Sequence, residues 1–264
     1  MLSSLKNLFN SNNKKSEVNS RFIFVIGSGR SGTHFLGRIF QNNPSVELLL
    51  EDPKYFSLVK DINIKQKKDL LPKLTKRYKK LSYSSDKPYL LEKSHPNIWS
   101  VDYLTKEFPD AFFIGINRNV YQVVYSMLNH KGVLNWYNTL PNNVENPFLG
   151  ITDENKKEFS NLPIESKCTL RWYAHIKESY ELKKKYPEKV IIINYNDLCN
   201  NYFEEVEKLE SIFNVKLREF SEKPNNVSGD KFKKLDSEKI ANIQNVLKTL
   251  DLVGFEKSLT EFNK

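Results

Sequence analysis

The stretch RFIFVIGSGRSGTHFL, residues 21–36, joins a short apolar run to a glycine-rich turn and then to an amphipathic segment. The apolar residues 22–26 have the length of a buried strand and are far too few to span a membrane. Three glycines in the turn permit a tight bend and a close backbone approach. Ser31 and Thr33 lie where a helix begins, so their hydroxyls and the first free amides can face an anion, and Arg30 adds a cation. The stretch therefore predicts a phosphate-binding strand, loop and helix.

Two common phosphate-binding motifs share features with this turn. The pattern Gly27-x-Gly29-x-x-Gly32 fits the dinucleotide fingerprint, and Glu51 stands roughly where a ribose-binding acid is expected. The spacing from Gly27 to Gly32 also fits a P-loop, but Thr33 occupies the place of the required lysine. A glycine turn with only a structural role is a further alternative. The turn alone does not decide among these interpretations.

A second candidate anion site follows the apolar run 111–116. Arg118 comes directly after that run, and the apolar residues beyond it recur at helical spacing, which places Ser126 within a helix. The two residues are eight positions apart, slightly more than two helical turns. An extended arginine covers that gap, so both side chains can meet on one oxyanion. Neither a nicotinamide site nor an ordinary ATP site needs a second phosphate pocket of this kind.

Together, the two motifs resemble those of sulfotransferases that use 3′-phosphoadenosine 5′-phosphosulfate (PAPS). The segment 30–33, Arg-Ser-Gly-Thr, is similar to the loop that holds the 5′-phosphosulfate, and Arg118-x7-Ser126 resembles the 3′-phosphate site. The likeness covers roughly residues 21–220 and is closest to bacterial carbohydrate and tyrosylprotein sulfotransferases. It implies a P-loop-like three-layer α/β fold with a central, mainly parallel sheet flanked by helices.

The resemblance also implies which residues bind the donor. A basic loop at 227–234 precedes the last expected helix, where the family closes over the 3′-phosphate and adenine, although an exposed basic turn is the alternative. His34 follows the first loop and either packs there or reaches the acceptor side. The predicted donor-binding residues are Gly29, Arg30, Ser31, Gly32, Thr33, His34, Arg118, Ser126, Ser228 and Lys231.

The implied chemistry is attack of an acceptor hydroxyl on the sulfur of PAPS, with no metal. Lys93 would stabilise the transferring oxygen, and Arg30 the 5′-phosphosulfate. Three residues are candidates for the general base. Glu51 ranks first because it matches tyrosylprotein and bacterial carbohydrate enzymes. His95 ranks second because Lys93-x-His95 resembles the cytosolic enzymes, and Glu92 ranks third because Glu92-Lys93 resembles the heparan type.

Composition suits this interpretation without establishing it. The chain has 264 residues and a formal net charge of +9, which fits a multiply anionic donor. The lysines are dispersed along amphipathic segments, so we expect no nucleic-acid partner. The resemblance of the Glu51 pattern to bacterial glycan enzymes implies a carbohydrate acceptor, with a small metabolite or peptidyl tyrosine as alternatives. The only two cysteines, Cys168 and Cys199, favour a reducing compartment. No apolar run reaches the length of a membrane helix, and a cytoplasmic enzyme is predicted.

Strand and helix signals alternate along the chain. Residues 1–20 are expected to form a mobile lead-in and 21–264 one domain, in which the loop-rich, aromatic segment 131–163 is either an acceptor-side insertion or a surface excursion. Strands are predicted near 22–26, 88–91, 111–116 and 189–194. Helices are predicted near 32–42, 66–80, 98–107, 119–130, 166–186, 202–213 and 236–250.

Two other functions remain open at this point. A nucleotide-dependent phosphotransferase is favoured by the spacing of Gly27 and Gly32, but it lacks both the lysine and an evident Mg²⁺-binding aspartate. A catalytically inactive anion-binding module of the same fold is the other alternative. Oligomeric state cannot be derived from these residues.

Overall fold

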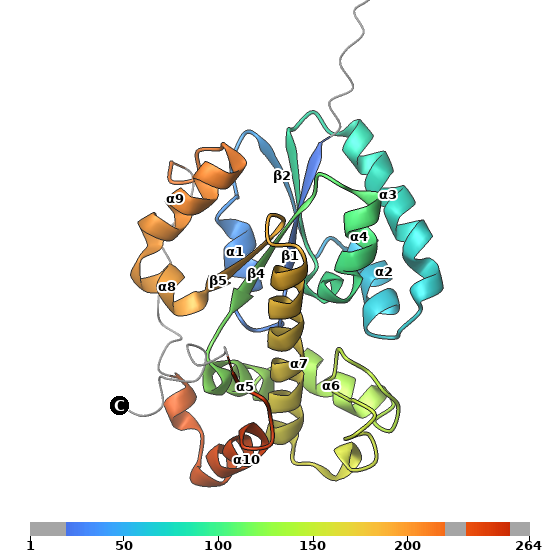
Figure 1. Cartoon of the computed structure of the whole chain (residues 1–264), viewed down its shortest axis with the longest axis vertical. Helices are drawn as coiled ribbons and strands as arrows, with labels where there is room; N and C mark the ends of the chain where they lie inside the picture. Colours follow the sequence, from blue (N-terminus) through green and yellow to red (C-terminus); the bar gives the residue numbers. More distant parts are fainter. Residues whose placement is uncertain (1–19, 220–230, 254–264) are drawn as a thin grey trace, which may run out of the picture.

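A five-stranded, entirely parallel sheet forms the centre of the computed structural model, which describes residues 20–219 and 231–253 (Figure 1). The strand order is β2-β3-β1-β4-β5. The four predicted strands are present, and β2 is an additional edge strand that was not predicted. The strands are β1 Arg21–Ile26, β2 Val46–Leu50, β3 Tyr89–Lys93, β4 Phe112–Asn117 and β5 Val190–Asn194.

The helices follow the predicted alternation, with several differences. The first helix ends at Arg38 instead of 42, because the chain turns there and Asn42 adopts a positive φ of 64°. Helices α2, α6 and α8 were not predicted, and α6 lies inside the segment expected to be loop-rich. The helices are α1 Thr33–Arg38, α2 Pro53–Asn63, α3 Leu71–Ser84, α4 Val101–Glu107, α5 Val120–Leu128, α6 Lys131–Thr139, α7 Ile164–Lys185, α8 Tyr195–Asn200, α9 Tyr202–Phe213 and α10 Ser237–Leu247; the 3₁₀ turns are η1 Lys68–Leu70, η2 His95–Ser100, η3 Phe159–Asn161 and η4 Lys231–Lys234.

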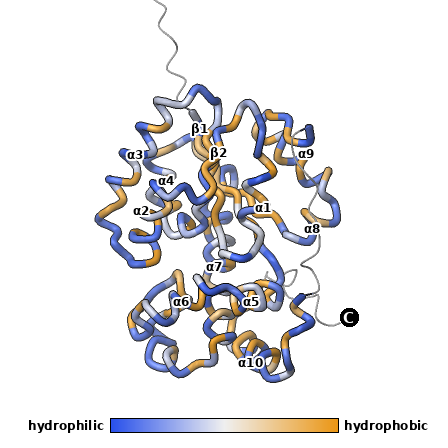
Figure 2. The backbone as a smooth tube through the Cα atoms, turned by 180° about the vertical axis from the view of Figure 1, so that it is seen from behind, coloured by the Kyte–Doolittle hydropathy of each residue, from blue (hydrophilic) through white to orange (hydrophobic). Residues whose placement is uncertain are grey.

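The central strand β1 shows why the fold has three layers. Alternate side chains of a strand point to opposite faces, so Phe22 and Phe24 pack among α2, α3 and α4, whereas Ile23 and Val25 pack among α1, α8 and α9. Helices thus cover both faces, as a parallel sheet requires. Figure 2 shows the apolar strand segments gathered in the middle of this part of the molecule. The predicted α/β class is confirmed, and the sheet is entirely rather than mainly parallel.

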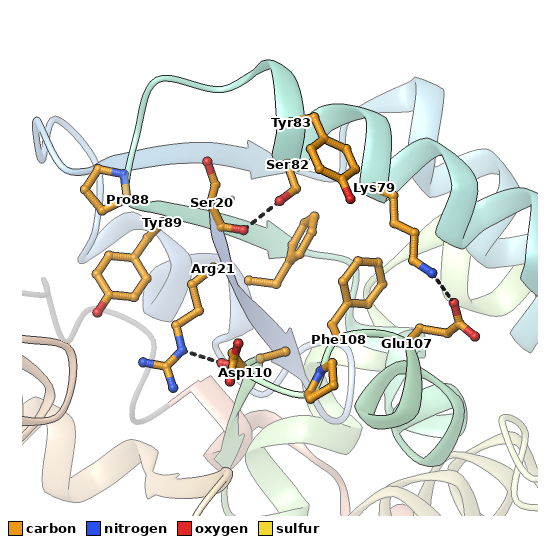
Figure 3. A pocket seen from close by; sticks show the side chains of 13 residues that line it. Ser20, Arg21, Lys79, Ser82, Tyr83, Pro88, Tyr89, Glu107, Phe108 and Asp110 are labelled. Carbon is orange, nitrogen blue, oxygen red and sulfur yellow. Dashed lines mark hydrogen bonds and ion pairs between the residues drawn. The ribbon is translucent and has the colours of Figure 1, made fainter. Parts of the chain in front are cut away.

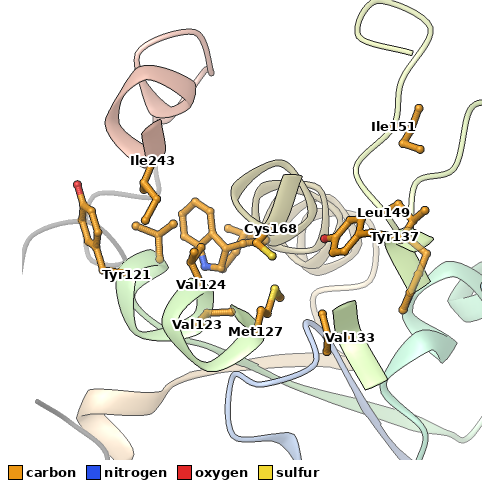
Figure 4. Packing of buried hydrophobic residues seen from close by; sticks show 14 of the residues in the cluster. Tyr121, Val123, Val124, Met127, Val133, Tyr137, Leu149, Ile151, Cys168 and Ile243 are labelled. Carbon is orange, nitrogen blue, oxygen red and sulfur yellow. The ribbon is translucent and has the colours of Figure 1, made fainter. Parts of the chain in front are cut away.

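A helical layer lies beyond the carboxyl ends of the strands and contains a third apolar cluster (Figure 1). Helices α5, α6 and α10 pack there around the N-terminal half of α7, with Val124, Met127 and Cys168 among the buried side chains (Figure 4). Helix α7 continues from this layer to the sheet, where Leu182 joins the cluster on one face. The indole of Trp172 donates a hydrogen bond to the carbonyl of Arg118 (3.0 Å), which ties α7 to the end of β4.

Two searches of residues 20–219 and 231–253 bear on membrane and metal binding. No helix in these ranges has the length and apolar character needed to cross a bilayer. No group of three histidine, cysteine, aspartate or glutamate side chains in the same ranges is arranged to hold a metal ion.

Candidate active site

The carboxyl ends of β1, β2 and β3 meet a wall made by α6 and α7 and enclose a cavity of about 160 Å³. Ligands of parallel sheets bind at this edge of the strands. The cavity brings together seven of the residues predicted from sequence, together with six others. The lining residues are Gly29, Arg30, Thr33, His34, Glu51, Phe56, Lys93, His95, His130, Gly132, Val133, Trp136 and Arg171.

The glycine-rich loop is held closely between two side chains. Gly32 has φ of 105°, and a Cβ there would come within 2.7 Å of the Tyr195 ring. A Cβ at Gly29 would lie 2.9 Å from Nε2 of His95. The Oγ of Ser31 is buried without a hydrogen-bond partner among the described residues, so it is free to donate to a ligand. The loop conformation therefore depends on both glycines and leaves polar groups available.

The two predicted anion motifs are in contact, although not through the expected pair. Arg30 Nε donates a hydrogen bond to Ser126 Oγ (3.1 Å). Arg118 instead donates from Nε to Gln122 Oε1 (2.6 Å), and its guanidinium lies 4.0 Å from the centroid of the Tyr195 ring. Ser126 thus joins the loop to α5, and Tyr195 contacts both motifs.

Glu51 is the centre of the polar contacts in the cavity. Its carboxylate accepts a hydrogen bond from Lys93 Nζ, and its oxygens lie 3.4 Å from His34 Nε2 and 3.5 Å from His95 Nδ1. Burial by itself would raise the pKa of Glu51, but the two histidines and the Lys93 ammonium outweigh it and hold the pKa well below its usual value. Glu51 is therefore ionised, and it is the residue on which three predicted side chains converge.

Lys93 and His95 are both almost completely inaccessible to solvent, with exposed fractions of 1% and 5%. Burial lowers the pKa of Lys93, while Glu51 opposes that shift. Burial also lowers the pKa of His95, to about 3, so its imidazole is neutral at physiological pH. Neither ring nitrogen of His95 makes a well-formed hydrogen bond within the described residues, and Nδ1 lies 3.5 Å from a Glu51 oxygen. The imidazole is neutral, and its low pKa makes it a weak proton acceptor in this state.

Glu92 lies on the other side of β3 from Lys93, because neighbouring strand residues face opposite ways. It is fully buried, accepts a hydrogen bond from Ser94 Oγ and another from Asn97 Nδ2 (2.8 Å), and does not line the cavity. Burial raises the pKa of Glu92 to about 7. The structure thus does not bring the third candidate base to Glu51 and His95.

Comparison with known proteins shows the family of the chain. The sequence profile of the sulfotransferase family matches residues 22–219, three quarters of the chain. The chain belongs to the sulfotransferase family. The prediction made from the loop and the Arg-x7-Ser pattern is therefore confirmed at the level of the family. A search of curated protein sequences gave no significant match.

Solved structures support the same fold for this sulfotransferase. Mouse sulfotransferase SULT7A1 complexed with PAP is 14% identical, with 90% of this chain and 86% of that chain covered and a TM-score of 0.53. The sulfotransferase domain of the Synechococcus PCC 7002 olefin synthase is 12% identical (88% and 97% covered, TM-score 0.51). That of the curacin biosynthetic pathway is 16% identical (86% and 98%, TM-score 0.50). At these identities the likeness concerns the fold.

The last two predicted donor-binding residues lie in or next to a part of the sulfotransferase that the structure does not describe. Ser228 falls outside the described residues, as does the lead-in up to residue 19. Lys231 is the exposed first residue of η4, which packs against α5 through the buried ring of Phe232. The donor role of both residues stays a prediction.

Sequence reasoning missed Arg171, which lines the cavity from α7. A signal was present, because Arg171 shares one helical stripe with Cys168, Trp172 and His175, all of them buried. An arginine within an apolar stripe is unusual and indicates a special role. Trp136 was seen only as part of an aromatic loop, and its helix α6 was not predicted.

A larger cavity, of about 540 Å³, lies at the opposite edge of the sheet, beside the amino ends of β1, β3 and β4 (Figure 3). Both of its basic side chains have partners: Lys79 pairs with Glu107 (2.6 Å), and Arg21 donates to the Asp110 carbonyl. None of its described side chains has a buried polar atom without a hydrogen bond. The smaller cavity is therefore the candidate active site.

Proposed function

We propose that this sulfotransferase moves the sulfuryl group of PAPS to a hydroxyl on a carbohydrate or a small metabolite. The observation that carries the proposal is the convergence of Arg30, Glu51 and Lys93 on one cavity beside the glycine-rich loop, in a chain of this family. The neighbour SULT7A1 was solved with PAP, the product that remains after transfer.

The donor would lie along the edge of the sheet between the two anion motifs. The loop amides, Ser31 and Arg30 would bind the 5′-phosphosulfate, since their polar groups face the cavity or lack partners. Arg118 and Ser126 would bind the 3′-phosphate, and a phosphate oxygen would replace Gln122 as the partner of the Arg118 guanidinium. Two bound phosphates position the donor, and positioning lowers the barrier by several kcal/mol.

The Lys93–Glu51 pair supports a defined sequence of charge movements. The acceptor oxygen bonds to sulfur as the bond from sulfur to the bridging oxygen breaks, and negative charge grows on the leaving phosphate. Lys93 would move toward that charge and away from Glu51. Once the Lys93 ammonium has moved away, the carboxylate of Glu51 becomes more basic. This happens at the point where the proton of the acceptor hydroxyl must be removed. His95, neutral and next to the loop, is the alternative acceptor of that proton.

The acceptor would enter from the side of residues 131–163. This segment contributes α6, and Gly132, Val133 and Trp136 of that helix line the cavity. We therefore propose that 131–163 is the acceptor-side part of a single domain covering 21–264. The reducing, cytoplasmic location stays a prediction; the structure shows Cys168 and Cys199 as free thiols.

Two binding and transfer measurements test the proposed function. Calorimetric titration should show that PAP binds much more tightly than AMP, ADP or NAD, because only PAP has the 3′-phosphate. Equal affinity for AMP would remove the case for a 3′-phosphate pocket, and preference for a nucleoside triphosphate would favour the phosphotransferase. Labelled PAPS incubated with an extract of the source organism should yield a labelled product. Tight PAP binding with no transfer would instead indicate the inactive anion-binding module.

A further inference from the structure

Arg171 is a completely buried arginine that lacks a hydrogen-bond partner. Its exposed fraction is 0%, and Nε, Nη1 and Nη2 all lack a partner among the described residues. The nearby Tyr137 hydroxyl donates its own hydrogen bond to the Lys167 carbonyl (3.3 Å) and can offer the guanidinium at most one weak acceptor for its several N–H groups. Leaving a buried charge without a partner costs several kcal/mol. Such a cost indicates that something outside these residues completes the site.

Aromatic rings hold the guanidinium in place but do not satisfy it. Its central carbon lies 4.7 Å from the centroid of the Trp136 ring and 4.4 Å from that of Phe148. The two rings meet edge to face, with centroids 5.0 Å apart. Cation–π contacts contribute about 0.5–2 kcal/mol each and fix the orientation, but ring faces accept no strong hydrogen bond. The guanidinium N–H groups are therefore oriented yet still available.

Arg171 comes from a different element than the proposed donor-binding groups, although it lies beside the glycine-rich loop. In the same cavity Lys93 pairs with Glu51, and Arg30 donates to Ser126. Arg171 stands on α7 in the wall that α6 completes, and its Nη2 would lie 3.3 Å from a Cβ built on Gly29. All three guanidinium nitrogens of Arg171 are buried and lack a hydrogen-bond partner among the described residues.

We propose that Arg171 binds a carboxylate of the acceptor, so that the enzyme sulfates hydroxyl groups of acidic acceptors. The inference rests on the proposed function and specifies its substrate class. A planar guanidinium with free N–H groups matches a carboxylate in two parallel hydrogen bonds. The cavity of about 160 Å³ has room for about five waters of ~30 Å³ each. That space is enough for the acceptor's carboxylate and a short spacer, which would place the acceptor's hydroxyl beside Glu51 and His95.

Thermal unfolding of the PAP-saturated protein separates a binding role from a structural one. Arg171→Met keeps the length of the side chain but removes the buried charge, so Tm should stay the same or rise. Replacing potassium chloride by potassium acetate at constant ionic strength should raise Tm of the wild type and of Arg38→Met, an exposed arginine on α1, but not of Arg171→Met. A lower Tm in both Arg171→Met and Arg171→Lys would mean that Arg171 has a structural role, and it would overturn the proposal. A rise of Tm in acetate that is still present in Arg171→Met would also overturn it.

Kinetics and fractionation test the acceptor assignment. When the source extract is divided by anion exchange at neutral pH, the labelled product should form from the retained, acidic fraction. Arg171→Met should raise the KM for that acceptor by about ten- to a hundredfold, with the Kd of PAP and PAPS unchanged. Acceptor activity in the unretained fraction alone, or a loss of PAPS but not PAP affinity, would contradict the assignment. If the wild type does not bind PAP, the proposed function itself fails. That outcome is distinct from failure of the Arg171 assignment, because it does not depend on the Arg171 variants.

Discussion

The two ends of the same parallel strands differ in how their polar groups are satisfied. At the carboxyl edge, a cavity of about 160 Å³ contains buried polar atoms of His95 and Arg171 that lack hydrogen bonds within the described residues, and the buried Ser31 Oγ of the adjoining loop lacks one as well. At the amino edge, a cavity of about 540 Å³ contains basic side chains that already have partners, Lys79 with Glu107 and Arg21 with the Asp110 carbonyl.

This difference is the reason for choosing the candidate site by its unsatisfied polar groups and not by its volume. A buried polar group without a hydrogen bond costs about 1–3 kcal/mol, and a charged one costs more. A folded chain tolerates several such groups in one place when a ligand completes them. The unsatisfied groups, and not the size of the cavity, identify the carboxyl edge as the site.

The largest expected effect compares one lysine from each edge. Lys93→Ala removes the buried cation that pairs with Glu51, and sulfuryl transfer should fall by about a thousandfold, the upper range for a single group that stabilises developing charge. Lys79→Ala removes an exposed ion pair at the other edge and should change the rate by less than about twofold. Steady-state rates with the acceptor found in the extract measure both. Similar losses of the sulfuryl-transfer rate in the two variants would contradict the assignment of the active site to the carboxyl edge.

The base assignment is tested within the carboxyl edge. Glu51→Gln keeps size and hydrogen bonding but accepts no proton, so kcat should fall at least about a hundredfold with the Kd of PAP nearly unchanged. His95→Asn should cost less, and the low-pH limb of kcat should follow a carboxylate. An active Glu51→Gln together with an inactive His95→Asn would transfer the role of base to His95.

The sequence placed the residues that follow the strands better than those that α6 and α7 contribute to the candidate site. The loop after β1 and Arg118 after β4 each follow a buried apolar run, so local pattern places them at one edge of a parallel sheet. Glu51 was located by family resemblance, while its strand β2 was missed, because an edge strand of five residues containing Glu47 gives a weak signal.

The wall made by α6 and α7 depends on contacts between residues that lie far apart in the sequence. Arg171 and Trp136 meet only because α6 and α7 pack together, and the helix of Trp136 was expected to be loop. Similarly, Arg30 reaches Ser126 across 96 positions of sequence, whereas the nearer Arg118 turns toward Tyr195. Side-chain direction at such points is decided by tertiary packing and not by spacing.

A smaller effect is expected for binding of the donor's unreactive end. Arg118→Ala should raise the KM for PAPS and the Kd of PAP about ten- to a hundredfold, with kcat nearly unchanged, because loss of a charge-assisted contact costs about 1.5–3 kcal/mol. Ser126→Ala should have a weaker effect in the same direction. Arg21→Ala, at the amino edge, is the matched control and should leave both constants unchanged. Wild-type PAP affinity in Arg118→Ala would overturn the assignment.

The smallest effect concerns stability and pH. Burial lowers the pKa of His95 from its ordinary 6.5 to about 3, so between these values the unfolded chain binds a proton that the folded chain does not. The free energy of unfolding should therefore fall as the pH falls below 6.5, by up to about 2 kcal/mol at pH 5 from this group. His95→Asn should show a shallower decline of Tm from pH 7 to pH 5. Parallel declines would mean that His95 is not held neutral by burial.

Hydrogen–deuterium exchange with and without saturating PAP tests most directly which edge of the sheet is the active site. The account predicts slower exchange in peptides covering 27–34 and 117–126 when PAP is bound, and no change in peptides covering 79–84 and 107–111. Protection confined to the amino-edge peptides would contradict it, because the donor would then occupy the larger cavity instead of the one that contains Glu51 and Lys93.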